Sequence, residues 1–252
     1  MAQPRDYQFD LPASGRPTSV TIPEMWYPGV QNYWPRSTSR RNVGDHIEGV
    51  RAVIIHATAG ASSAGAVSVM NSSPAASFHW LVPDEDEPQH GEIVWSCVRE
   101  RDAAWHVRPD KRHPAVNQNR TQVNHWSLGI EIVNRQSGGD SFSNWQVAVT
   151  AQIVRYCWAK YPNLVHVISH ARLDPGRRSD PGVNFPWNRF EQLVLSTDIE
   201  PLDALASEPA SSGAIDLLDS FTTAPDDAEA ANFAYDDDAP LDLDRLHQAP
   251  DK

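Results

Sequence analysis

Short apolar runs of strand length constrain this chain more than any other feature of its sequence. The run Ala52-Val-Ile-Ile55 is an example, since it is rich in β-branched residues and is followed directly by His56. Similar runs occupy residues 77–82, 92–98, 127–133 and 165–169. None approaches the roughly 18 apolar residues that span a bilayer. Runs of this length, bounded by turn-forming residues, predict core strands and no transmembrane segment.

Segments with helical periodicity alternate with these strands. We expect Ser62 to cap a helix that runs toward Asn71, and Ser143 to cap a longer helix that continues to Lys160. A last helix is expected over residues 187–195. Interleaved strands and helices predict an α/β domain over residues 46–197.

Residues 1–45 show neither pattern and are punctuated by six prolines between Pro4 and Pro35. We expect an extended N-terminal arm that packs Tyr27, Tyr33 and Trp34 on the main domain. The first residues, Met-Ala-Gln-Pro-Arg-Asp, are polar and lack the apolar segment of a secretory signal. A cytoplasmic protein is therefore expected, with signal-less export or release by lysis as open alternatives.

Charge divides the chain in two. The formal net charge of the whole chain is −12. Residues 198–252 hold 15 acidic and two basic residues, a net charge of −13. Residues 1–197 hold 18 acidic and 19 basic residues, a net charge of +1. Low hydrophobicity with high charge predicts a disordered acidic tail. Alternatively, the short amphipathic stretches at 217–221 and 241–246 fold on a protein partner. Neither part predicts binding to nucleic acid.

The chain has two cysteines, Cys97 and Cys157, which are too few for a disulfide framework. Each lies in an apolar stretch, so we expect buried free thiols.

Two histidines and one aspartate are candidate metal ligands. His56 ends a core strand, His170 follows another apolar run, and Asp180 lies ten residues later in a turn-rich loop. Two imidazoles and one carboxylate leave the fourth tetrahedral position of Zn²⁺ open, as a catalytic zinc site requires. Because His56 and His170 are far apart in the sequence, their spacing alone leaves a second interpretation open, namely polar strand ends and a turn-forming aspartate.

Five sequence blocks carry a resemblance to a known family. In order they are Val53-Ile-Ile-His-Ala-Thr-Ala-Gly60, Ser77-Phe-His-Trp-Leu-Val82, Ala104-Trp-His106, Asn124-His-Trp-Ser-Leu-Gly-Ile-Glu-Ile-Val-Asn134 and His170 through Gly-Arg-Arg-Ser-Asp-Pro-Gly182. The chain resembles the type 2 N-acetylmuramoyl-L-alanine amidases, which include AmpD-like bacterial zinc amidases, phage amidase-type lysozymes and animal peptidoglycan recognition proteins. The resemblance covers about residues 50–195 and neither the arm nor the tail.

The resemblance implies a fold and a set of roles. The implied fold is a single mixed β-sheet flanked by helices. The implied ligands of one Zn²⁺ per chain are His56, His170 and Asp180. Glu131 would exchange protons with the attacking water, and Arg178 would stabilise the negative oxygen of the tetrahedral intermediate.

Trp105 and His106 match a cleft-wall pair of the family and are expected to contact substrate.

Two positions depart from the family pattern. Arg178 stands where AmpD-like members usually carry lysine, and Phe78 stands where phage members carry a catalytic tyrosine. The AmpD-like arrangement built on Glu131 is therefore favoured.

The activity that the resemblance implies is zinc-dependent hydrolysis of the amide bond between N-acetylmuramic acid and L-alanine in peptidoglycan or muropeptides. Three alternatives stay open at this point. They are a non-catalytic peptidoglycan-binding module, an exported or phage cell-wall lytic effector with the same chemistry, and an interaction protein that uses the acidic tail.

Overall fold

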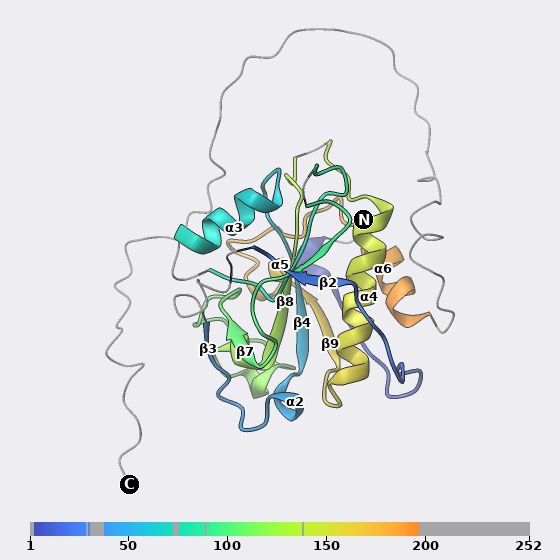
Figure 1. Ribbon diagram of the computed structural model, residues 1–252. Coiled ribbons are helices and arrows are strands. Elements are labelled where there is room, and N and C mark those ends of the chain that lie inside the picture. The colour runs from blue at the N-terminus through green and yellow to red at the C-terminus, as the bar shows by residue number, and fades with distance from the viewer. Residues whose placement is uncertain are drawn as a thin grey trace, which may run out of the picture. The chain divides into compact units, whose positions relative to one another are not determined.

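The computed structural model describes residues 3–28, 30, 38–72, 76–88, 90–137 and 139–196 (Figure 1). The expected tail and two aromatic residues of the expected arm, Tyr33 and Trp34, lie outside the described residues. Within the described part of the chain, no helix combines the length and the apolarity needed to cross a membrane.

A mixed seven-stranded sheet forms the centre of the domain, in the order β1-β9-β4-β8-β5-β6-β2. Four central strands run parallel, namely β9 (His166–Ser169), β4 (Ala52–Ala57), β8 (Ser127–Ile132) and β5 (Trp80–Val82). Strand β6 (Val94–Ser96) is antiparallel to β5. All five strands that the sequence predicts are therefore present, and the mixed sheet is confirmed.

The N-terminal segment contributes strands to both edges of this sheet. Strand β1 (Gln8–Asp10) pairs antiparallel with β9, and β2 (Glu24–Trp26) pairs parallel with β6. Strand β3 (Thr38–Arg40) pairs antiparallel with β7 (Asp102–Ala104) in a separate two-stranded sheet. This small second sheet accompanies the expected mixed sheet. The sequence does not predict β3 and β7, because strands of three residues are too short to show a period of two and these two strands lie far apart in the chain.

Helices flank the sheet, and the two that lie together on one face are α4 (Asn144–Lys160) and α6 (Trp187–Leu195) (Figure 1). Helix α4 begins at a capping box in which the Ser143 hydroxyl accepts from Gln146 N, as expected. Helix α3 (Ser63–Ser72) begins after Ser62, whose hydroxyl accepts from Gly65 N at 3.1 Å. The short elements are η1 (Pro4–Asp6), α2 (His46–Gly49), η3 (Asn117–Asn119), η4 (Val123–Trp126) and α5 (His170–Leu173).

Alternation along β4 and β8 gives the two faces of the sheet different chemistry. Val53 and Ile55 of β4, with Leu128, Ile130 and Ile132 of β8, belong to the main core that includes α4 and α6. The alternate positions point to the other face, because successive side chains of a strand point in opposite directions. Those positions include His56, Ser127, Gly129 and Glu131. The polar residues of the sequence blocks therefore gather on one face. Cys97 and Cys157 are buried free thiols, as expected.

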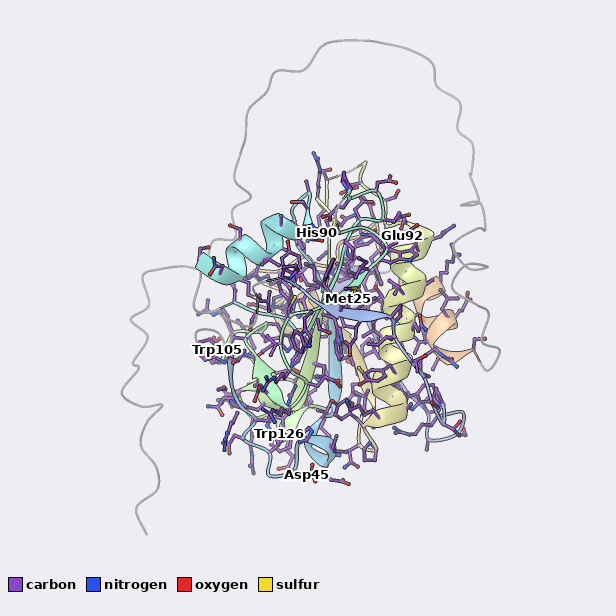
Figure 2. The ribbon with its side chains drawn as sticks, in the orientation of Figure 1. Met25, Asp45, His90, Glu92, Trp105 and Trp126 are labelled. Carbon is purple, nitrogen blue, oxygen red and sulfur yellow. The ribbon has the colours of Figure 1, made fainter. Side chains whose placement is uncertain are left out.

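Strand β1 is held by aromatic packing. Phe9 is buried, and its ring meets those of Trp187 and Phe190 edge-on, with centroids 5.7 Å apart in both pairs. We predict that Phe9→Ala lowers the free energy of unfolding by about 3 kcal/mol, because it removes a buried aromatic ring. Met25→Ala, in the opposite edge strand β2, should change it by less than about 0.5 kcal/mol, since Met25 is 58% exposed (Figure 2). Urea unfolding of both variants measures the free energy of unfolding. An equal loss in the two variants would contradict the conclusion that the packing of Phe9 stabilises β1.

Candidate metal centre

The structure brings His56, His170 and Asp180 together in one buried cluster. The Nδ1 atoms of His56 and His170 are 2.9 Å apart. The Asp180 Oδ2 atom lies 3.0 Å from His170 Nδ1 and 3.4 Å from His56 Nδ1. All three side chains are at most 8% exposed. The three atoms therefore form a compact triangle, and the cluster could hold a metal ion.

The triangle has the size that tetrahedral zinc requires. Zinc–ligand bonds of 2.0–2.2 Å at tetrahedral angles place neighbouring ligand atoms about 3.3 Å apart. Burial, followed by the electrostatic interaction with His170, lowers the pKa of His56 to about 4. Burial acts to raise the pKa of Asp180, but its contacts with His170 and His56 outweigh burial and lower it. A neutral imidazole and an ionised carboxylate are the forms that bind metal.

Sheet topology and two local contacts position the ligands. His56 lies near the end of β4, and His170 begins α5 directly after the neighbouring parallel strand β9. The Asp180 carbonyl accepts from Ala171 N at 2.9 Å, which ties the loop back to α5. The same loop is anchored by buried Asp174, whose carboxylate forms an ion pair with Lys111 at 2.9 Å.

A chain of hydrogen bonds behind His56 fixes its ring. His56 Nε2 lies 3.0 Å from His106 Nδ1. With a metal ion bound at His56 Nδ1, Nε2 would carry the proton and donate to His106 Nδ1. His106 Nε2 then carries the second proton and faces the Ser127 hydroxyl at 3.3 Å. That hydroxyl donates to the Val123 carbonyl at 2.8 Å. Every donor in this chain meets an acceptor, so it selects one tautomer for both rings. His170 differs, since its buried Nε2 has no hydrogen-bond partner among the described residues.

Gly129 makes room for His106. A Cβ atom at this position would lie 2.6 Å from Cγ and 2.8 Å from Nδ1 of the His106 ring. Distances below 3.0 Å are essentially never found for a real Cβ, so a side chain here would displace the ring. Sequence reasoning missed this role, although a glycine inside a strand is a known signal of close approach.

Glu131 lies beside the cluster. It is the register partner of His56 in the neighbouring strand and is 8% exposed. Its carboxylate makes no hydrogen bond to any residue that the structure describes. Burial, followed by the negative charge of Asp180, raises the pKa of Glu131 well above its usual value, while the positive charge of Arg178 opposes this. Arg178 also lowers the pKa of His56, so its cation acts on the cluster and on Glu131 together.

The two residues expected to contact substrate lie in different surroundings. His106 is buried, and both of its ring nitrogens face other residues of the chain rather than the surface. Trp105 is half-buried at the periphery of the domain (Figure 2), and its backbone N donates to Ser77 Oγ at 2.8 Å. Phe78 is buried in a core cluster, and His79 accepts from Gly129 N at 2.9 Å, as a structural histidine would.

Comparison with known proteins places this arrangement in a family. The model of the N-acetylmuramoyl-L-alanine amidase family matches residues 47–183, just over half of the chain. The chain belongs to this family. The matched range contains all three ligands, Glu131 and Arg178. All three residues that the sequence proposes as metal ligands are present in one cluster that could hold a metal ion.

Curated relatives and one solved structure agree with this assignment. The chain is similar to N-acetylmuramoyl-L-alanine amidase AmiD of Escherichia coli, with 28% identity over 57% of this chain and 52% of AmiD. It is also similar to 1,6-anhydro-N-acetylmuramyl-L-alanine amidase AmpD of Salmonella typhimurium, with 32% identity over 43% of this chain and 60% of AmpD. The crystal structure of AmpDh3 from Pseudomonas aeruginosa matches with a TM-score of 0.51 and 28% identity, over 58% of this chain and 60% of that chain. The chain thus spans about half to three fifths of the length of these relatives.

We predict that Gly129→Ala weakens metal binding by about 10- to 100-fold, because displacement of His106 removes the acceptor that orients His56. Competition with a chromogenic chelator measures the affinity. Gly139→Ala is the matched control, since nothing lies within 4 Å of a Cβ there. Unchanged metal affinity in Gly129→Ala, or equal loss in both variants, would contradict the role of His106.

Proposed function

We propose that this protein is a zinc-dependent N-acetylmuramoyl-L-alanine amidase, which hydrolyses the amide bond between N-acetylmuramic acid and L-alanine of peptidoglycan or muropeptides. The observation that carries the proposal is the convergence of two imidazole nitrogens and one carboxylate oxygen beside Glu131. Family membership and the amidase names of the relatives support it.

Each residue of the cluster has a task in this reaction. His56, His170 and Asp180 would hold the ion. Zinc, when bound, supplies a Lewis acid that polarises a carbonyl and makes water a stronger acid. The Glu131 carboxylate takes a proton from the attacking water and delivers it to the nitrogen of the leaving L-alanine. The Arg178 guanidinium stabilises the negative charge that develops on the carbonyl oxygen.

Metal removal tests the proposal as a whole. Incubation with a chelator should abolish the release of stem peptide from a muropeptide, and about one equivalent of Zn²⁺ per chain should restore it. Mass spectrometry of the products should show free N-acetylmuramic acid and a peptide that begins with L-alanine. Full activity in the metal-free protein would overturn the proposal.

Glu131→Gln should keep the metal and lose the activity. The substitution preserves shape but removes the proton acceptor, so we expect kcat to fall by about 10²- to 10⁴-fold. Zinc content by mass spectrometry should remain near one per chain, since Glu131 is outside the ligand triangle. Wild-type turnover in this variant would refute the assigned role.

Arg178→Ala should lower kcat by about 10²- to 10³-fold, the usual effect of removing an oxyanion donor. Arg178→Lys should restore most of this loss, because an ammonium group supplies the same charge without the planar fork. Arg101→Ala, which removes an exposed arginine, serves as control. Equal activity of the alanine and lysine variants of Arg178 would argue against a role of its charge.

A further inference from the structure

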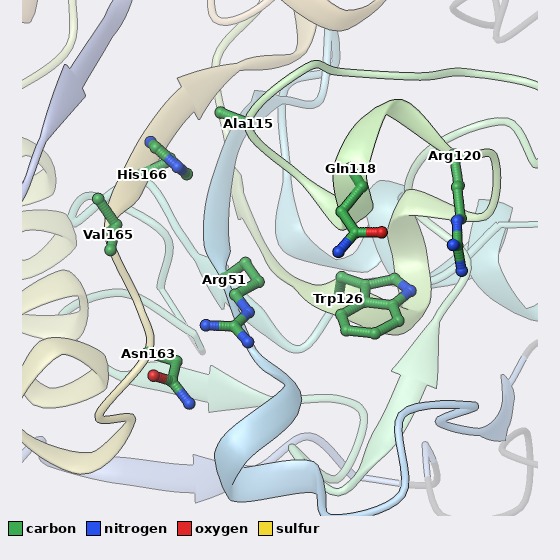
Figure 3. Close-up of a pocket in the computed structure, with 8 residues that line it drawn as sticks. All are labelled: Arg51, Ala115, Gln118, Arg120, Trp126, Asn163, Val165 and His166. Atoms are coloured by element: carbon green, nitrogen blue, oxygen red, sulfur yellow. The ribbon is translucent and has the colours of Figure 1, made fainter.

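A cavity lies at the amino ends of β4, β8 and β9, whereas the metal cluster lies at the carboxyl ends. It has a volume of about 360 Å³ (Figure 3) and is lined by Arg51, Ala115, Gln118, Arg120, Trp126, Asn163, Val165 and His166. Arg51 directly precedes β4, Trp126 directly precedes β8, and His166 begins β9. The five residue steps from Arg51 to His56 span about 16 Å. The cavity is therefore separate from the metal centre.

The rim of this cavity is built on fixed backbone. The Arg51 carbonyl accepts from Val165 N and His166 N, both at 3.1 Å, and Arg51 N donates to the Trp126 carbonyl at 2.8 Å. These bonds tie the starts of three neighbouring strands together. The lining residues next to the strands thus keep their positions without a ligand.

Two arginines of the cavity have no counter-ion among the residues that the structure describes. The side chains of Arg51 and Arg120 make no ion pair or hydrogen bond with any residue in the described part of the chain. No aspartate or glutamate lines the cavity. Two carboxylates contact lining residues, since Asp10 lies 2.7 Å from His166 Nδ1 and Glu48 accepts from Asn163 Nδ2 at 2.6 Å. Among the described contacts, neither carboxylate pairs with the guanidinium group of Arg51 or Arg120. The cavity therefore presents two guanidinium groups to an incoming anion.

The other lining groups suit a sugar ring. Trp126 is half-buried against a core cluster and contributes an aromatic ring to the cavity, and the Gln118 amide points toward it (Figure 3). An indole offers a large apolar face, and amides exchange hydrogen bonds with hydroxyl and acetamido groups. Guanidinium groups bind carboxylate or phosphate through two parallel hydrogen bonds. The volume is in the range of small-molecule pockets.

We propose that this cavity binds an acidic sugar, namely an N-acetylmuramic acid residue whose lactyl carboxylate is free. The identity of this ligand rests on the proposed function, because hydrolysis of the muramoyl amide leaves that carboxylate on the glycan strand. The cavity would thus hold a glycan strand from which stem peptides have already been removed. A second binding site on the same glycan strand would raise the effective concentration of polymeric substrate at the metal cluster. It would leave the cleavage of small muropeptides unchanged.

Nuclear magnetic resonance of the full-length, zinc-loaded protein tests the proposal at the cavity itself. The indole N–H signal of Trp126 is assigned by its disappearance in Trp126→Phe. Titration with N-acetylmuramic acid should shift this signal to saturation. N-acetylglucosamine, which has the same ring without the carboxylate, should not. N-acetylglucosamine 1-phosphate separates a phosphate site from a carboxylate site.

Arg51→Ala and Arg120→Ala should each weaken the binding of N-acetylmuramic acid by about tenfold or more, and Arg101→Ala should leave it unchanged. The spectrum of each variant reports whether it is folded, and Arg51→Lys, which keeps the charge, should bind at an intermediate strength. The proposal is overturned if the Trp126 signal does not move, if it moves equally with N-acetylglucosamine, if it responds to the phosphate sugar alone, or if both arginine variants bind like wild type. Because the signal needs no turnover, a failed amidase assay with intact Trp126 binding would overturn the proposed function and leave the acidic-sugar site standing.

Discussion

The site depends on three electron-pair donors that are held about 3 Å apart in a buried position. The Nδ1 lone pairs of His56 and His170 and the Asp180 carboxylate oxygen repel one another unless a proton or a cation lies between them. The lowered pKa of His56 disfavours a second proton on its imidazole near neutral pH. A divalent cation satisfies all three donors at once, which is why this arrangement is better suited to metal binding than to an ordinary ion pair.

The order of the strands makes this convergence possible. In the order β9-β4-β8, the strand that carries His56 lies between the strand that precedes His170 and the strand that carries Glu131. Since the three strands are parallel, their carboxyl ends meet at one edge of the sheet. Only Asp180 and Arg178 must be brought in by a loop, and the Asp174–Lys111 ion pair and the Ala171–Asp180 hydrogen bond anchor that loop. On the polar face behind His56, Gly129 leaves the space that His106 fills.

Much of this could be predicted from the sequence because the informative signals are local. The apolar run before His56 predicts β4, and the serines at 62 and 143 predict two helix starts, all of which the structure confirms. The alternation Ile130-Glu131-Ile132 leaves Glu131 on the face opposite the main core, as the structure also shows. What could not be predicted depends on pairing across the chain. The three-residue edge strands β1 and β2 carry no periodicity, and the place of His106 behind His56 depends on a contact with Gly129 that no spacing reveals. Arg51 and Arg120, which have no ion-pair partner among the described residues, come from separate segments, so they form no motif in the sequence.

The most direct test of the account is the fate of the water oxygen. A defined muropeptide is digested by the zinc-loaded protein in water enriched in ¹⁸O, and the products are analysed by mass spectrometry. The account predicts one ¹⁸O atom in the lactyl carboxylate of N-acetylmuramic acid and none in the released peptide. Label in a carboxylate of the stem peptide, or no cleavage by the zinc-loaded protein, would contradict it.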